Sequence, residues 1–193
     1  MADRSAQPAR DRRVQRTQRL LARALIDLTL EKGYAAVSIR DITARAEVGY
    51  ATFFRHYPDK DALLLDALEV FIDALVQRLQ MRPEADADAE GTLIFDYVAE
   101  HSELCRVLLA SPAREALLQR AREIGLASAL RQEALAPPGA IPPEIAAHHL
   151  VTASISLIQW WLEQGMPYPP ATMGRVYAEL IVRPARRALA AAS

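Results

Sequence analysis

The chain has 193 residues, which is enough for one compact domain or for a small domain beside a larger one. Hydrophobic residues make up 51% of it and charged residues 24%, a composition that excludes pervasive disorder. Ala, Leu, Arg and Glu are abundant and glycines number only 7, so side-chain entropy favours helices and we expect an all-α protein.

Several classes of protein are disfavoured by the same sequence. It has no run of about 18 apolar residues for a membrane span and no signal-peptide core at its N-terminus, so we expect a cytoplasmic protein. Cys105 is the single cysteine and cannot form an internal disulfide. No Cys/His cluster has zinc-ligand spacing, and adjacent His148 and His149 point in different directions on a helix, so we predict neither a metal site nor a cofactor.

The charge is divided unequally along the chain. The net charge is −1, but residues 1–60 carry 12 Lys and Arg against 7 acidic residues, a net charge of +5, and the remainder carries −6. A basic end on an acidic body is typical of a protein that presents that end to a polyanion.

The N-terminal segment begins with a polar stretch. Residues 1–11 show no apolar period and are interpreted as a mobile basic arm. From Val14 onward, apolar residues recur at spacings of three and four, which predicts a first helix that ends near Lys32 and Gly33.

Two short helices are predicted next. Ser38, with Asp41 three positions later, has the pattern of a reciprocal cap that starts a helix running to about Ala46. Residues 47–49 are a tight turn, and residues 50–56 form the second short helix. Two short helices joined by such a turn in the basic segment suit the major groove of DNA, although a helical hairpin with solvated charges gives the same pattern.

A long helix and a helical C-terminal region follow. Pro58 breaks the chain and Asp59 caps a helix that runs from Lys60 to about Met81 and could link two domains. The remaining helices are predicted at residues 91–110, 112–134, 144–164 and 171–183, the last one kinked by Pro184. The helix at 144–164 has so few polar positions that we expect it to be buried nearly all round.

The run from Ser38 to Lys60, with residues 31–34 before it and 61–64 after it, resembles the helix-turn-helix of the tetracycline-repressor (TetR) family. The resemblance covers roughly residues 14–68 and implies a dimeric repressor with a divergent ligand-binding bundle behind the DNA-binding helices. It divides the chain into an arm at 1–11, a helix-turn-helix domain at 12–58 and a helical ligand-binding and dimerisation domain at 59–193.

The same resemblance implies which residues contact DNA. It places Arg40 and the start of the second short helix near base edges or adjacent phosphates. Near the backbone it places Phe54, Arg55, His56 and Lys60. Arg40 is suited to the O6 and N7 atoms of a guanine, and Thr52 and Lys60 to phosphate oxygens. The implied DNA-contacting residues are Ser38, Arg40, Gly49, Tyr50, Ala51, Thr52, Phe54, Arg55, His56 and Lys60.

The sequence departs from the family pattern at two positions. Phe54 replaces a common tyrosine, which removes a hydroxyl that could bind phosphate. Glu47 replaces a frequent turn glycine, at a cost of about 1 kcal/mol if that position is left-handed. Phe53 and Tyr57 are interpreted as core residues.

The C-terminal region is expected to dimerise through the helices near 144–164 and 171–183, two copies of each forming a four-helix bundle. Candidates for an inducer pocket are Phe95, Tyr97, Trp160 and Met166, although packing is the preferred interpretation of each of them. Cys105 is interpreted as a buried structural thiol in preference to a redox sensor.

These features favour a ligand-responsive transcriptional regulator, acting as a repressor, that binds a palindromic operator as a dimer and is released by a small-molecule inducer. The alternative is a helical protein-interaction module whose basic end contacts an acidic partner. We do not expect an enzyme, because the sequence shows no nucleophile with a base, no phosphate-binding glycine loop and no metal motif.

Overall fold

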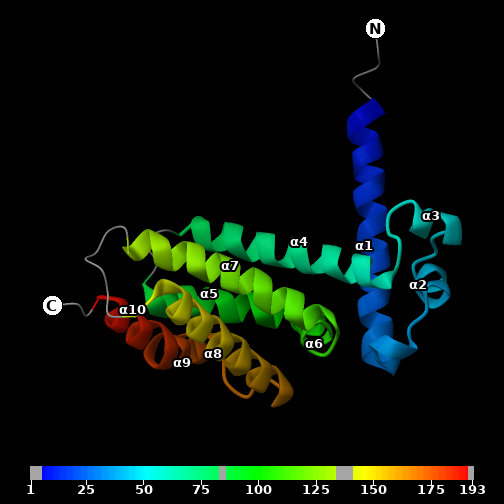
Figure 1. Cartoon of the computed structure of the whole chain (residues 1–193). Coiled ribbons are helices and arrows are strands. Elements are labelled where there is room, and N and C mark those ends of the chain that lie inside the picture. The colour runs from blue at the N-terminus through cyan, green and yellow to red at the C-terminus, as the bar shows by residue number, and fades with distance from the viewer. Residues whose placement is uncertain (1–5, 83–85, 134–140, 191–193) are drawn as a thin grey trace, which may run out of the picture. The chain divides into compact units, whose positions relative to one another are not determined.

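The computed structural model describes residues 6–82, 86–133 and 141–190, and within these ranges the chain is helical and has no strands (Figure 1). The predicted all-α class is confirmed. The helices are α1 (Ala6–Lys32), a short 3-10 helix η1 (Tyr34–Ala36), α2 (Ile39–Arg45), α3 (Tyr50–Phe54), α4 (Lys60–Gln80), α5 (Ala87–Glu100), α6 (Ser102–Leu109), α7 (Ala113–Glu133), α8 (Pro143–Glu163), α9 (Pro170–Tyr177), a π-helical segment η2 (Ala178–Val182) and α10 (Arg183–Ala190).

The chain forms two compact units, residues 1–70 and residues 71–193. The division falls inside α4, later than the boundary predicted before Asp59. The first turns of α4 belong to the N-terminal unit because Leu63 and Leu64 are buried in its core and the Tyr57 hydroxyl donates to Asp66 at 2.5 Å. No helix in the described residues is long and apolar enough to cross a membrane.

In the N-terminal unit, α1 contributes an apolar stripe at helical spacing. Leu21, Ala24, Leu25 and Leu28 are all buried, as the periodicity predicts. The helix begins at Ala6, within the segment predicted as an arm. Pro8 is compatible with this start, because an N–H in the first turn of a helix has no intrahelical acceptor and its loss there costs no hydrogen bond. Residues 1–5 of the predicted arm lie outside the described residues.

In the C-terminal unit, three helix limits differ from those predicted. The helix expected at 91 starts at Ala87, because the Asp86 side chain caps it by accepting from the Ala89 N–H at 2.9 Å. The helix expected at 91–110 is broken at His101, which leaves helical geometry (φ −119°, ψ 28°). Where a kink was expected at Pro184, the structure has the π-helical segment η2 just before it. Proline has no N–H to donate to a carbonyl one turn earlier, and the wider π turn leaves room between its ring and that carbonyl.

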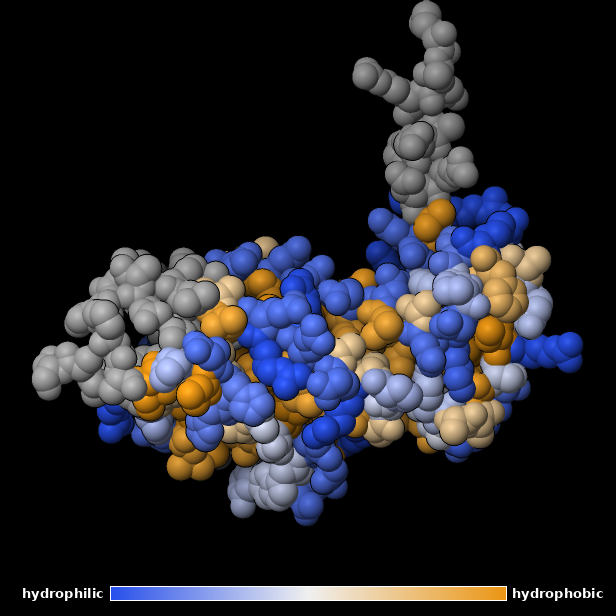
Figure 2. Space-filling view, viewed as in Figure 1, coloured by the Kyte–Doolittle hydropathy of each residue, from blue (hydrophilic) through white to orange (hydrophobic). Residues whose placement is uncertain are grey.

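The helix α8 is less buried than its composition predicts. In the single chain, its exposed positions include Ile145, Thr152, Ser156 and Trp160, which follow one another at or near helical spacing along one side. Figure 2 shows hydrophobic side chains exposed among hydrophilic ones on the visible face of the C-terminal unit. The prediction of burial all round is therefore wrong for the single chain, because part of this helix is not covered by the other helices.

Two glycines allow α5 and α9 to pack with their backbones in contact. A Cβ atom added to Gly91 would lie 2.6 Å from the carbonyl oxygen of Gly174, and one added to Gly174 would collide with the backbone nitrogen of Thr92. Beside this crossing, Phe95 packs edge-to-face against Trp161 with ring centroids 5.1 Å apart, and both side chains are buried.

This crossing predicts that Gly174→Ala lowers the free energy of unfolding by about 3 kcal/mol, because the new methyl group meets backbone atoms that cannot rotate away. Urea unfolding followed by circular dichroism measures the change. Gly49→Ala is the control, since a Cβ there has an ordinary 3.5 Å contact with the Thr52 hydroxyl, and the poorer N-cap that Ala gives α3 should cost only about 1 kcal/mol or less. Equal effects of the two substitutions would contradict the prediction.

Candidate nucleic-acid interface

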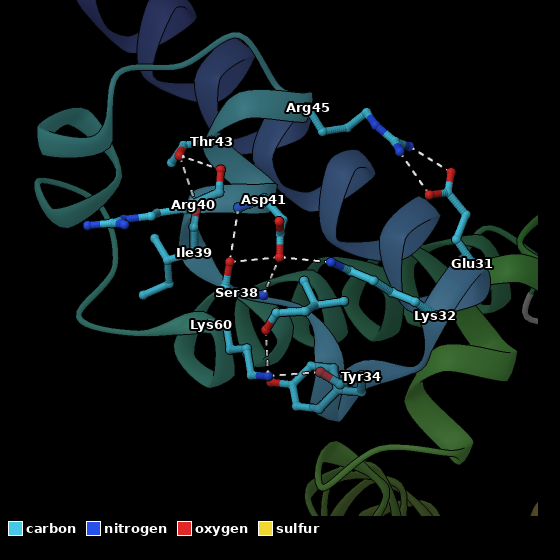
Figure 3. Close-up of polar contacts among 11 residues, drawn as sticks. Glu31, Lys32, Tyr34, Ser38, Ile39, Arg40, Asp41, Thr43, Arg45 and Lys60 are labelled. Carbon is cyan, nitrogen blue, oxygen red and sulfur yellow. Dashed lines mark hydrogen bonds and ion pairs between the residues drawn. The ribbon is translucent and has the colours of Figure 1, made fainter.

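The start of α2 is fixed by the reciprocal cap that the sequence predicts. The Ser38 hydroxyl accepts from the Asp41 N–H at 3.2 Å, and the Asp41 carboxylate accepts from the Ser38 N–H at 2.9 Å and from its hydroxyl at 2.7 Å. Lys32, at the end of α1, donates to the same carboxylate at 2.9 Å (Figure 3). These bonds, from Lys32 first and Ser38 second, hold the pKa of Asp41 well below its usual range.

A second polar link joins α1 to α2. The guanidinium of Arg45 donates two hydrogen bonds of 2.8 Å to the two carboxylate oxygens of Glu31. This bidentate pairing fixes the orientation of the planar guanidinium as well as its distance. Together with the Lys32–Asp41 pair it attaches both ends of α2 to the last turn of α1.

The turn between α2 and α3 contains a left-handed residue. Glu47 has φ +53°, and the Val48 N–H beyond it donates to the Thr43 carbonyl at 3.0 Å. The position is therefore left-handed, a conformation that favours glycine, and the Cβ of Glu47 costs about 1 kcal/mol there.

The helix α3 is anchored by one residue and presents the others. Phe53 is fully buried and its ring centroid lies 5.9 Å from that of the buried Tyr57, so both are core residues as predicted. Tyr50, Ala51 and Phe54 are exposed. These exposed side chains therefore form the outer face of the helix that the sequence assigns to DNA recognition.

The polar residues of this region differ in their exposure and in their contacts with other residues of the chain. Arg40 is exposed and, in Figure 3, extends away from the polar cluster around Asp41. Arg55 is also exposed, but its guanidinium donates to the Thr52 hydroxyl at 2.6 Å. His56 is partly buried, with its ring beside that of Tyr57.

Lys60 has a role within the fold that sequence reasoning missed. Its ammonium donates to the carbonyls of Tyr34 at 2.8 Å and Val37 at 2.9 Å, and lies 4.4 Å from the centroid of the Tyr34 ring. The Tyr34 hydroxyl in turn bonds to Asp61. These contacts join residues about 25 positions apart, and no local pattern in the sequence signals them.

The four candidates for an inducer pocket have different surroundings. Phe95 is buried against Trp161, and Tyr97 is buried with its hydroxyl donating to the Phe71 carbonyl at 3.0 Å. Trp160 is 44% exposed and stacks on Tyr168, whereas Met166 is left-handed (φ +59°) just after α8. An open hollow of about 440 Å³ in this unit is lined by none of the four, but by Arg106, Leu109, Ala110, Gln159, Leu162, Glu163 and Gly165.

Cys105 is buried, as predicted for a structural thiol. Desolvation raises its pKa to about 12, so the reactive thiolate is scarce at neutral pH. Among the described residues, no group of three or more His, Cys, Asp and Glu side chains is placed to hold a metal ion.

The cap of α2 predicts a pH-dependent effect of Asp41→Asn. Because the folded-state pKa of Asp41 is lowered, its contribution to stability is present above the ordinary carboxyl pKa of about 3.9 and is lost as the pH falls through the folded-state value. The urea midpoint of the variant should fall below that of the native protein at pH 7, and this gap should narrow at pH 3. Asp96→Asn, on the exposed surface of α5, serves as the control and should show no such narrowing. A gap of equal size at both pH values for Asp41→Asn would rule out the ionic contribution.

Two family models match most of the chain. The model described as bacterial regulatory proteins, tetR family, matches residues 21–67, and the model described as transcriptional regulator C-terminal region matches residues 92–182.

Curated relatives and solved structures point the same way. An uncharacterised HTH-type transcriptional regulator of Bacillus subtilis, YxbF, is 27% identical over 182 residues, which are 89% of this chain and 46% of that protein. An HTH-type transcriptional repressor of Mycobacterium tuberculosis is 38% identical over 87 residues, 42% of this chain and 46% of that protein. The chain thus spans about half the length of these relatives.

The fold is shared with solved structures of low identity. A putative TetR-family regulator from Syntrophomonas wolfei has a TM-score of 0.76 at 20% identity, over 89% of this chain and 96% of that one. A TetR regulator from Streptococcus agalactiae has a TM-score of 0.65 at 22% identity, over 90% and 97%. With the α2–α3 geometry and the two family models, these likenesses lead to one conclusion: the chain belongs to the tetR family of bacterial regulatory proteins and carries that family's helix-turn-helix DNA-binding domain.

Proposed function

We propose that this protein is a cytoplasmic transcriptional repressor that binds a palindromic operator as a homodimer and is released by a small-molecule inducer. The observation that carries the proposal is the α2–α3 arrangement, in which Arg40 and the outer face of α3 are exposed. The Asp41 and Arg45 contacts fix α2, and the burial of Phe53 anchors α3. The net charge of +5 on residues 1–60 supports contact with a polyanion.

In this proposal Arg40 reads a guanine, since its guanidinium can donate to O6 and N7 together. Gly49, Tyr50, Ala51 and Thr52 approach base edges or the neighbouring phosphates. The contacts to the backbone come from Ser38, Arg55, His56 and Lys60, and Phe54, which has no polar atom, lies between the backbone and the base edges. An ammonium has three N–H groups, so Lys60 can keep its two hydrogen bonds to carbonyls and donate a third hydrogen bond to a phosphate oxygen.

A dimer is proposed because a single helix-turn-helix has a small footprint, and paired recognition helices suit half-sites about 34 Å apart. The exposed apolar side chains of α8 and of the segment after α9 support an interface there. Ile145 is 58% exposed, Trp160 44% and Leu180 71%. Burying such large side chains in a two-fold interface stabilises it without a further partner.

Release by an inducer needs a ligand that prefers the state not bound to DNA, and linkage then makes operator and ligand mutually antagonistic. The continuity of α4 supports this proposal, since one helix contributes residues 60–70 to the N-terminal unit and residues 71–80 to the C-terminal unit. A change in the C-terminal bundle that moves α4 would alter the spacing of the recognition helices.

The proposal is tested by selection from a random duplex pool, with binding measured at several salt concentrations. The native protein should enrich a palindrome and lose affinity steeply as salt rises. Arg40→Ala should bind the selected operator about 5- to 150-fold more weakly and relax the preference for one base pair, and Thr52→Ala should weaken binding to all sequences.

Arg114→Ala, which removes an exposed arginine of the C-terminal unit, is the control and should bind as the native protein does. If the folded native protein enriches no sequence and its binding does not depend on salt, the regulator proposal fails and a protein-interaction module takes its place.

The dimer is tested separately with Leu180→Glu, which places a charge on the proposed interface. The dissociation constant of the dimer, measured by analytical ultracentrifugation, should rise at least about tenfold, because the substitution acts twice in a two-fold interface. Val70→Glu changes a side chain of similar exposure (64%) on α4 and should leave the dimer intact. A native protein that is monomeric at micromolar concentration would contradict the proposal.

A further inference from the structure

The recognition helix carries an exposed pair of aromatic rings, and we propose that the Tyr50–Phe54 pair reads the 5-methyl groups of thymine in the major groove. This inference rests on the proposed operator binding and deepens it, because it names the chemistry of the bases that α3 contacts.

The first observation is where the two rings lie. Tyr50 is 50% exposed and Phe54 46% exposed, and the two are four residues apart, so they share one side of the helix. Phe53 is fully buried on the side toward the core. Ala51 is also exposed, so the outer face of α3 is mainly apolar over these three residues, with the Tyr50 hydroxyl as its one polar side-chain group. Figure 2 shows hydrophobic residues at the surface of the N-terminal unit where α3 lies in Figure 1.

The second observation is that the pair is held in place. The rings of Tyr50 and Phe54 meet edge-to-face with centroids 5.1 Å apart, and Phe54 meets the buried Phe53 in the same way at 5.4 Å. The exposed rings are thus positioned by a core residue, and little side-chain entropy remains to be lost when they contact a ligand.

The third observation is the chemistry that this face lacks. The phenyl ring of Phe54 has no polar atom, and the ring of Tyr50 has one hydroxyl at its tip. The Thr52 hydroxyl accepts a hydrogen bond from Arg55 at 2.6 Å and keeps its own proton to donate, so the two rings are the apolar contact surface of this helix. In the major groove the apolar group that distinguishes bases is the thymine methyl, and aromatic and small apolar side chains are its partners.

DNA is the occupant that these features favour. The pair lies on the same helix-turn-helix as Arg40, within a segment whose net charge is +5, and charge complementarity brings this face to a polyanion. Burial of the exposed aromatic surface against thymine methyl groups then contributes favourable binding free energy.

The test changes the DNA and keeps the protein intact. Each thymine of the selected operator is replaced in turn by deoxyuridine, which lacks only the 5-methyl group, and dissociation constants are measured by fluorescence anisotropy. At one or more half-site positions the native protein should bind about fourfold more weakly per methyl removed. Thymines outside the half-sites are the control and should be insensitive.

The assignment to the pair is tested with variants on the same DNA series. In Phe54→Ala the deoxyuridine effect should disappear at one position, and in the double variant Tyr50→Ala/Phe54→Ala at every position. Phe54→Leu keeps an apolar side chain and should keep the effect. Circular dichroism verifies that each variant is folded, and the measurements on the native protein need no variant.

Three results would overturn the inference: equal affinity of the native protein for thymine and deoxyuridine operators, a deoxyuridine effect that persists in the double variant, or a selected half-site without thymine. Each of them leaves operator binding intact. Failure of the proposed function itself looks different, because no operator is then enriched at all.

Discussion

The arrangement of the DNA-binding unit depends on the ammonium group of Lys60. It donates to the backbone carbonyls of Tyr34, which begins η1, and of Val37, which follows η1, and it lies over the Tyr34 ring. One side chain thereby joins the first turn of α4 to the segment that leads from α1 into α2. The Tyr34–Asp61 bond strengthens the same junction, and the Tyr57–Asp66 bond joins the loop after α3 to α4. In the release mechanism that we propose, a movement of α4 acts on the recognition helices through this junction.

The short recognition helix is stable only in this setting. Five residues cannot form an isolated helix in water, since the hydrogen bonds of one turn do not offset the entropy lost in nucleation. Burial of Phe53 adds the stabilising free energy that this short helix needs. The left-handed Glu47 turns the chain so that Tyr50 and Phe54 face outward. The strained turn and the exposed rings are both unfavourable for the free protein, and both are explained if this face binds DNA.

The C-terminal unit is held together by close packing and by links between distant segments. The glycine contact brings α5 and α9 together at backbone distance, and Arg183 bridges to Asp88 at 2.7 Å, which attaches α10 to α5. The indole of Trp161 donates to the Tyr168 carbonyl at 2.9 Å and so orients the chain that leads from α8 into α9. Of the unit's exposed large hydrophobic side chains, Ile145, Trp160 and Leu180 lie where we propose the dimer interface, whereas Met81 and Tyr168 lie outside it.

The sequence by itself determined the all-α class, the Ser38–Asp41 cap, the burial of Phe53 and the tetR resemblance, because helical periodicity and capping are written in residues three or four positions apart. Only the tertiary structure decided that Lys60 binds two carbonyls, that Gly91 meets Gly174, that α8 keeps an exposed side and that Tyr50 and Phe54 form one exposed pair fixed by a core ring. Contacts of the first two kinds join segments tens of residues apart, and exposure depends on which helices pack together. Neither leaves a local pattern from which it could be predicted.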